Sequence, residues 1–246
     1  MKDRVALVTG GMGHIGTAII QALHAAGCKA LATLQFPGNN TAADWLAARK
    51  QEGIDVVMAE ANVTDGEQVK AALAEIEAKT GPIDILVNGA GITRDNTLRK
   101  MSPDQWNAVI DVNLNSVFNV TQPLIQGMTD RGFGRVINIS SINGQKGQIG
   151  QANYSAAKAG MHGFTKAVAQ ETARKGVTVN TISPGYIDSP MINAVPDEIR
   201  ENIRKTIPVQ RYGQASEIAR AVVFLADEEA GFITGHDLSV NGGQYM

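Results

Sequence analysis

The chain has 246 residues, which is long enough for an α/β domain with a large buried core. Its formal net charge is −2 and it holds no basic block, so no nucleic-acid partner is expected. The single cysteine, Cys28, excludes an internal disulfide, and the four histidines are scattered, so no metal site is expected. No apolar stretch reaches the roughly 18 residues of a membrane span, and the N-terminal apolar run is too short for a signal peptide. These features predict a soluble, cytoplasmic protein without membrane contacts.

The chain opens with a strand, a glycine turn and a helix. An aliphatic run at residues 4–9 leads into a turn rich in glycine, and helical periodicity follows at 17–26. This order places backbone N–H groups at a helix N-terminus, where a pyrophosphate binds. A tight turn without a ligand is the alternative. If a nucleotide binds here, the residues expected to contact it are Gly10, Met12, Gly13, His14, Ile15 and Gly16.

Strand and helix signals alternate over the rest of the chain. Further strands are expected at residues 29–34, 54–59, 83–87, 135–139, 177–182 and 238–240. Further helices are expected at 42–50, after a capping box at 64–67, after a capping signal at 102–105, after 152, and at 216–226. A looser segment at 188–206 is expected to form a lid. With no linker or repeat, the pattern predicts an α/β protein: one domain, 1–246, with a doubly wound parallel sheet of about seven strands and helices on both faces.

Small residues follow the predicted strand at 83–87. They read Asn88, Gly89, Ala90 and Gly91. Without bulky side chains, this backbone can run close beneath a bound nucleotide. We therefore expect all four residues to contribute to cofactor binding.

Tyr154 and Lys158 form the candidate centre of the chemistry. They are four residues apart in an alanine-rich helical segment, so they share one helix face. A nearby ammonium group favours the phenolate and lowers the phenol pKa, which lets a tyrosine pass a proton near neutrality. Ser141, thirteen residues before Tyr154, ends the strand at 135–139, and a loop with three glycines can bring its hydroxyl beside the phenol. A carbonyl that accepts hydride needs such donors, although the same Tyr/Lys spacing also occurs on ordinary helices.

Asn113 is a polar residue on an apolar helical stripe. The capping signal at 102–105 starts a helix whose stripe also contains Trp106, Val109, Ile110 and Val117. A buried amide must find hydrogen-bond partners. It either pins this helix to a strand or orders a water beside the active site, and periodicity favours neither.

These motifs, in this order and spacing over essentially the whole chain, resemble the short-chain dehydrogenase/reductase family, whose fold is the Rossmann fold. The resemblance implies that Tyr154 is the acid/base, that Lys158 binds the nicotinamide ribose and lowers the Tyr154 pKa, that Ser141 polarises the carbonyl and that Asn113 holds a relay water. It also implies cofactor contacts from Tyr154, Lys158, Asn62, Val63, Pro184, Gly185 and Ile187, and often a homotetramer. His14 stands where the family usually has glycine, so a strained or altered backbone is expected there.

Within that family, the segments 91–95, 130–135, 141–151, 176–181 and 241–243 are most similar to the members that reduce acetoacetyl-CoA for polyhydroxybutyrate synthesis. The neighbouring members that act on 3-ketoacyl groups carried by acyl carrier protein usually differ in the loop at 144–148, and they supply the alternative function. The resemblance implies reduction to (R)-3-hydroxybutyryl-CoA. The expected substrate contacts are Asp95, Gln148, Ile149, Gln151 and Tyr186, with Arg94, Arg99, Lys100 and Lys146 either meeting CoA phosphates or merely solvating the surface.

The choice between NADH and NADPH rests on the residues after the strand at 29–34. An acid about 20 residues beyond the glycine turn selects NAD, and a nearby base neutralises the 2′-phosphate of NADP. Residues 30–43 contain neither, while Gln35, Asn39 and Asn40 can hydrogen-bond ribose or phosphate. We therefore expect both NADPH and NADH to work, unless a distant base such as Arg49 reaches the phosphate.

Overall fold

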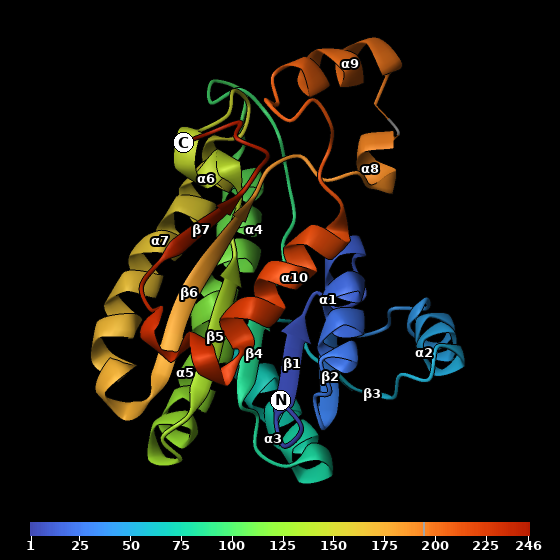
Figure 1. The fold of residues 1–246 in the computed structure, drawn as a ribbon. Helices are drawn as coiled ribbons and strands as arrows, with labels where there is room; N and C mark the ends of the chain where they lie inside the picture. Colours follow the sequence, from blue (N-terminus) through green and yellow to red (C-terminus); the bar gives the residue numbers. More distant parts are fainter. Residues whose placement is uncertain (194) are drawn as a thin grey trace.

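The computed structural model describes residues 1–193 and 195–246, which fold around a seven-stranded parallel sheet (Figure 1). Its strand order is β3-β2-β1-β4-β5-β6-β7, so the order reverses between β1 and β4. In such sheets, ligands bind in the crevice outside the carboxyl ends at this reversal. The predicted seven strands are confirmed as β1 (Val5–Thr9), β2 (Ala30–Gln35), β3 (Val56–Glu60), β4 (Ile85–Asn88), β5 (Gly134–Ile139), β6 (Val177–Pro184) and β7 (Asp237–Val240).

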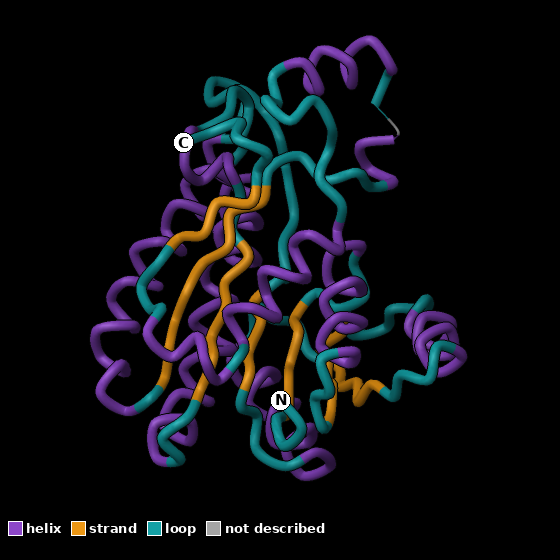
Figure 2. The backbone as a smooth tube through the Cα atoms, in the orientation of Figure 1, coloured by secondary structure: helices purple, strands orange, loops and turns teal. Residues whose placement is uncertain are grey.

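Helices cover both faces of the sheet, as Figures 1 and 2 show. On one face lie α1 (His14–Ala25) and α10 (Ala215–Ala226), and on the other lie α3 (Gly66–Thr80), α5 (Ser116–Asp130) and α7 (Ala152–Thr172). The remaining helices are α2 (Ala42–Gln51), α4 (Pro103–Ile110), α6 (Ile142–Lys146), α8 (Pro190–Asn193) and α9 (Asp197–Lys205). Within the described part of the chain, none of the helices is long and apolar enough to cross a membrane.

Strand β1 shows why both faces are apolar. Leu7 packs into the core cluster beneath α3 and α5, whereas its neighbour Val8 packs into the cluster beneath α1 and α10. Successive strand side chains point to opposite faces, so a sheet covered on both sides needs a continuous apolar strand. This accounts for the unbroken aliphatic run in the sequence.

Two helix starts differ from the predictions. Helix α1 begins at His14, three residues before the expected Thr17, because Gly13 is its N-cap. The predicted capping box at 64–67 is wrong: Asp65 caps α3, and its carboxylate accepts hydrogen bonds from the backbone N–H groups of Glu67 and Gln68. An aspartate and a threonine are both good caps, so composition alone does not separate adjacent candidates.

The helix after residue 102 is interrupted by a π-helical turn. The capping box of Ser102 and Gln105 starts α4 as expected, and the turn Asp111–Asn115 then joins α4 to α5. Val109, Val117 and Asn113 are buried, but Trp106 is 37% exposed, so its place on the predicted apolar stripe is wrong. A π turn changes the helical period, and such turns are frequent at functional sites.

Residues 188–206 contain α8 and α9, which stand above the carboxyl edge of the sheet in Figure 1. The partly helical character of this segment agrees with its expected structure. Residue 194 lies outside the described residues. The role of this segment as a lid stays a prediction.

A ladder of buried polar side chains crosses the middle of the sheet. Asn88 donates to Asn138 at 2.8 Å, Asn138 donates to Thr165 at 2.8 Å, and the hydroxyls of Thr165 and Thr181 lie 2.7 Å apart. All four residues are buried. Asn88 also donates to the buried Thr121 at 3.1 Å, so the ladder continues into α5.

Replacing Asn138 by alanine removes two buried hydrogen bonds, while Asn88 keeps its bond to Thr121 and Thr165 keeps its bond to Thr181. We expect the Asn138→Ala variant to lose about 1 to 3 kcal/mol of unfolding free energy, because each of the two lost hydrogen bonds contributes roughly 0.5 to 1.5 kcal/mol. Urea unfolding measures this loss. The control is Asn107→Ala on exposed α4, and an equal loss in both variants would contradict the ladder's contribution.

Candidate active site

The loops after β1 and β4 interlock at the reversal of strand order. Gly10 has φ +68°, and a Cβ placed on it would lie 2.8 Å from the Gly89 carbonyl oxygen. A Cβ on Gly16 would collide with the Gly10 carbonyl. The Thr9 hydroxyl accepts hydrogen bonds from the backbone N–H groups of Gly89 and Ala90, at 3.1 and 3.2 Å. The expected glycine turn is therefore a cradle whose shape excludes side chains.

Helix α1 begins in this cradle without a side-chain cap. Its N-cap is Gly13, and the first-turn N–H groups of His14, Ile15 and Gly16 have no acceptor within the helix. Such donors, together with the helix dipole, fit a pyrophosphate. Among the described residues other than glycine, only Gln210 has a left-handed backbone, so the strain expected at His14 is absent. The helical position of His14 accepts any side chain.

Several other residues expected to bind the cofactor have side chains that pack within the protein, so their backbone is the part left to face a cofactor. The Asn88 side chain belongs to the buried ladder, and Ile187 is buried beneath α10. Gly185 lies against Asn241, where a Cβ would be 2.8 Å from the Asn241 Cα, and Pro184 ends β6. Around the remaining candidates, Met12 contacts Asn39 (3.8 Å), Asn62 accepts hydrogen bonds from Thr64, and the Val63 carbonyl accepts one from Asn119.

Several side chains that follow β2 already hydrogen-bond neighbouring residues. The side-chain oxygen of Asn39 accepts hydrogen bonds from the backbone N–H and the hydroxyl of Thr41, so it closes a local turn. Arg49 donates to Glu52 at 3.0 and 2.6 Å. This guanidinium, named above as a base that could reach a 2′-phosphate, is therefore already paired.

Tyr154 and Lys158 share a face of α7. The Lys158 Nζ lies 5.7 Å from the centre of the Tyr154 ring and donates to the Ile139 carbonyl at 2.8 Å. The Ser141 hydroxyl lies close enough to the Tyr154 phenol to lower its pKa. The structure thus brings together the end of β5, the start of α6 and the first turns of α7, as the spacing predicted.

The loop that carries Ser141 is more regular than expected. Ser141 is the N-cap of the short helix α6, and its Oγ accepts a hydrogen bond from the backbone of Asn143 at 3.1 Å. A Cβ on Gly144 would lie 2.9 Å from the Lys158 backbone, so this glycine lets α6 pack directly on α7. Close packing, and not loop flexibility, positions the serine hydroxyl.

The titration of the cluster differs from the expectation. Burial raises the pKa of Tyr154, a hydrogen bond from Ser141 opposes that rise, and the charge of Asp95 adds to it. Burial also lowers the pKa of Lys158 to about 8. The expected lowering of the Tyr154 pKa is therefore wrong for the protein's own groups, because burial raises this pKa more than the Ser141 hydroxyl lowers it. At neutral pH the pair is a neutral phenol beside a largely protonated ammonium.

Asn113 pins the helix to the loop after β4. Its side chain accepts from the Ile92 N–H at 2.8 Å and donates to the Ile92 carbonyl at 2.9 Å. A Cβ on Gly91 would lie 3.5 Å from the Asn113 Oδ1 and 3.6 Å from the Lys158 Nζ, so both polar groups border the space that Gly91 leaves. These contacts agree with the first alternative, in which Asn113 fixes the helix in place. That Asn113 also holds a relay water stays a prediction.

Asp95 and Gln151, two expected substrate residues, lie together. Gln151 donates to Asp95 at 2.8 Å and accepts from Asn143 at 2.9 Å. The backbone of Asn96 bonds Gly150, which joins the two loops. This wall stands near Tyr154, since the Asp95 charge acts on its phenol.

The other substrate candidates border a groove of about 480 Å³. It is lined by Lys146, Gln148 and Tyr186 together with Ile199, Asn202, Ile203, Thr206 and Gln244. Ile149 is 91% exposed beside it, so it does not yet enclose a ligand. The groove contains residues of the expected lid, and the Lys146 ammonium bonds Gln148 at 3.0 Å on its wall.

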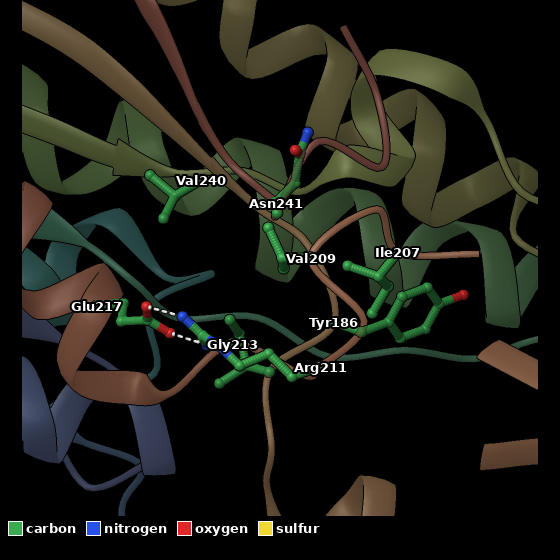
Figure 3. Close-up of a pocket in the computed structure, with 10 residues that line it drawn as sticks. Tyr186, Ile207, Val209, Arg211, Gly213, Glu217, Val240 and Asn241 are labelled. Carbon is green, nitrogen blue, oxygen red and sulfur yellow. Dashed lines mark hydrogen bonds and ion pairs between the residues drawn. The ribbon is translucent and has the colours of Figure 1, made fainter. Parts of the chain in front are cut away.

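Tyr186 also borders a smaller cavity of about 90 Å³, shown in Figure 3. There the Arg211–Glu217 ion pair and the apolar side chains of Ile207, Val209 and Val240 surround it. Neither Ser141 nor Tyr154 lines this cavity. We therefore assign the candidate chemistry to the cluster around Tyr154 and not to this cavity.

Asn153 is a site residue that the sequence reasoning missed. It is fully buried, and its amide donates to the carbonyls of Arg94 and Gln105 at 3.0 Å. Its own carbonyl accepts from the Tyr154 N–H. Asn153 thus anchors the first turn of α7, and its only sequence signal is a polar amide in an alanine-rich helix.

The chain is similar over its full length to known reductases. A family model described as enoyl-(acyl carrier protein) reductase matches residues 11–244. The acetoacetyl-CoA reductase of Shinella zoogloeoides is 57% identical, over 99% of both chains, and that of Cupriavidus necator is 52% identical, over 100% of both. The 3-oxoacyl-[acyl-carrier-protein] reductase of Salmonella typhimurium is 45% identical, over 100% of this chain and 98% of its own. With the cradle, the Ser141–Tyr154–Lys158 cluster and the seven-stranded parallel sheet, these matches identify the chain as a member of the short-chain dehydrogenase/reductase family.

Proposed function

We propose that the protein reduces acetoacetyl-CoA to (R)-3-hydroxybutyryl-CoA with a reduced nicotinamide cofactor. The observation that carries this proposal is the convergence of Ser141, Tyr154 and Lys158 beside the glycine cradle. The full-length similarity to acetoacetyl-CoA reductases supports this substrate over one carried by acyl carrier protein, which is the alternative.

The protein's own groups suit the reductive direction. The bound cofactor supplies the hydride to the 3-keto carbon. The Tyr154 phenol, kept protonated by burial, donates its proton to the carbonyl oxygen. The Ser141 hydroxyl donates a hydrogen bond to that oxygen and stabilises the charge that develops on it.

Lys158 assists the proton transfer from Tyr154. Its ammonium stabilises the phenolate that remains after the proton has left, and it binds the nicotinamide ribose. Asn113 borders the same space beside Gly91, so a water held there can return protons to the pair. The cradle residues Gly10, Gly13, His14, Ile15 and Gly16 hold the pyrophosphate.

The substrate lies between two walls. Asp95 and Gln151 form the wall near Tyr154, and Gln148 and Tyr186 line the groove that receives the thioester arm. We place Ile149 against the short acyl chain and the 188–206 segment over the groove as a lid. The protein acts in the cytoplasm, within polyhydroxybutyrate synthesis, as a homotetramer.

Steady-state kinetics with two carriers tests the substrate. We expect kcat/KM for acetoacetyl-CoA to exceed that for the acetoacetyl thioester of acyl carrier protein. It should also fall for acyl chains longer than about four or five carbons, because each misplaced methylene costs roughly 1 to 3 kcal/mol in a fitted pocket. A clear preference for the carrier-protein thioester would support the alternative function. Measuring each substrate with NADH and with NADPH also tests whether both cofactors work, with a selectivity below ~10³.

A further inference from the structure

A second polar cluster joins α6, α7, β6 and β7. At its centre is Asp237, the first residue of β7, which accepts hydrogen bonds from Ser183 on β6 at 2.6 Å and from Gln145 on α6 at 2.8 Å. The Nε2 of His162 on α7 lies 3.4 Å from the same carboxylate. The side chains of His162 and Asp237 are only 16% and 19% exposed. None of these residues takes part in the proposed reaction.

The cluster fixes Gln145 in one orientation. Its Nε2 donates to Asp237 and also to the Ser239 hydroxyl, each at 2.8 Å. A carboxylate accepts hydrogen bonds and cannot donate them, so the NH₂ group of the amide faces β7. Gln145 lies in α6, the helix whose N-cap is Ser141. The C-terminal part of the helix that begins at Ser141 is therefore tied to the sheet.

His162 holds the residue on the other side of Ser141. The His162 Nε2 lies 2.9 Å from the hydroxyl of the buried Ser140. That hydroxyl donates its single proton to the Lys158 carbonyl at 2.9 Å, so the ring nitrogen is the donor toward Ser140. The cluster thus holds the chain at residue 140 and again at residue 145, with Ser141 between the two.

We infer that Asp237 and Gln145 are positioning residues for Ser141, and that their hydrogen bond sets where its hydroxyl lies relative to the Tyr154 phenol. A helix of five residues has little stability of its own, so its contacts with the rest of the protein determine its place. Displacing a reacting group by about 1 Å can cost roughly 10²-fold in rate. The inference rests on the proposed function, because it requires that Ser141 stabilises the carbonyl oxygen.

The Gln145→Glu variant tests this link by setting a second carboxylate against Asp237. We expect kcat to fall by about tenfold or more, because the repulsion displaces α6. KM for the cofactor should change little, because the cradle lies at α1. Adding Asp237→Asn restores a hydrogen bond in the reverse direction, since the new amide donates to the new carboxylate. The double variant should therefore recover to within about threefold of the wild type.

The rates are measured with NADH and with NADPH at about pH 7.5, where free carboxyl groups are ionised. Two substrates are compared, acetoacetyl-CoA and ethyl acetoacetate, a 3-ketoester without a carrier. The ester keeps the test independent of whether CoA or acyl carrier protein is the natural carrier. The matched control is Gln126→Glu, since the exposed Gln126 donates to Asp130 at 2.8 Å near the end of α5. This control should change kcat by less than about threefold.

A second comparison separates positioning from a general loss of structure. Ser141→Ala should lower kcat by about 10²-fold, the range of a missing donor to the developing oxyanion. Adding Gln145→Glu to Ser141→Ala should lower kcat no further, because the hydroxyl that the first change displaces is already absent. A merely structural defect would lower kcat in both backgrounds.

Three results would overturn the inference while leaving the proposed reduction intact: an unchanged kcat in Gln145→Glu, no recovery on adding Asp237→Asn, or a further loss in the Ser141→Ala background. If Gln145→Glu fails to fold, Gln145→Met takes its place in the Ser141→Ala comparison. It removes the hydrogen bond without adding charge and should lower kcat about three- to tenfold. An unchanged kcat in Ser141→Ala would overturn the role of Ser141 in the proposed function, and the inference with it.

Discussion

The Tyr154→Phe variant is expected to lose at least ~10²-fold of turnover with acetoacetyl-CoA, the range of a missing general acid. Phenylalanine keeps the ring and its packing on α7 but cannot donate a proton to the carbonyl oxygen. Ser141 would still hydrogen-bond that oxygen, so the residual rate measures its contribution. Cofactor binding should change little, because the cradle lies at α1 and not at the phenol.

Single-turnover reduction with saturating cofactor separates this chemical step from binding. The control is Tyr212→Phe, whose hydroxyl donates to the Arg200 carbonyl at 2.7 Å, away from the cluster, and which should change turnover by less than about threefold. Retention of more than about a tenth of wild-type turnover in Tyr154→Phe, with chemistry rate-limiting, would show that another group donates the proton.

The Lys158→Met variant should lose activity and gain stability. Methionine has a similar volume but no charge, so the phenolate loses its stabilising ammonium, and turnover should fall by roughly 10² or more. In the folded protein, burial lowers the Lys158 pKa to about 8 from its ordinary 10.5, so the folded state carries an unfavourable buried charge at neutral pH. Removing that charge relieves roughly 3 kcal/mol, of which about 1 to 2 are lost again at the unpaired Ile139 carbonyl.

The pH dependence of this gain has a definite sign. Below pH 8 the lysine is protonated in both states, and the folded state bears the full cost of the buried charge. Between about pH 8 and 10.5 the unfolded wild-type chain binds a proton that the folded chain lacks, so wild-type stability rises with pH relative to the variant. The advantage of Lys158→Met should therefore be largest at pH 7 and shrink toward pH 10.

Urea unfolding of both proteins at several pH values, at equal protein concentration, measures this advantage. The control is Lys166→Met on the same helix, which removes the same charge from an exposed position. A Lys158→Met advantage that grows from pH 7 to pH 10 would contradict the burial of a charged lysine.

Local pattern was sufficient for the strands and for the shared helix face of Tyr154 and Lys158. A sheet covered on both faces demands continuous apolar strands, and the run from Val5 to Thr9 shows this demand without reference to any other part of the chain. The spacing of Tyr154 and Lys158 places them on one helix face for the same local reason, the period of the α-helix. Such features depend on neighbours within about ten residues, and these were predicted correctly.

The environment of those residues depended on distant segments. Burial by surrounding elements, which no spacing reveals, raises the Tyr154 pKa and reverses the expected direction. Trp106 on α4 is exposed despite its place on the predicted stripe, and the partner of Asn113 is the backbone of Ile92, 21 residues away. Side-chain titration and amide pairing are set by desolvation and by the geometry of packed elements.

The sequence by itself therefore determined the doubly wound sheet, the glycine turn and the shared helix face of Tyr154 and Lys158, because each depends on local periodicity or short spacing. The tertiary structure alone decided what lies beside them. Gln35 and Glu60 are 25 residues apart and meet only because β2 and β3 pair in register. Strand pairing is a non-local contact, so the residues that follow β2 contain no acid although the neighbouring strand places Glu60 beside them.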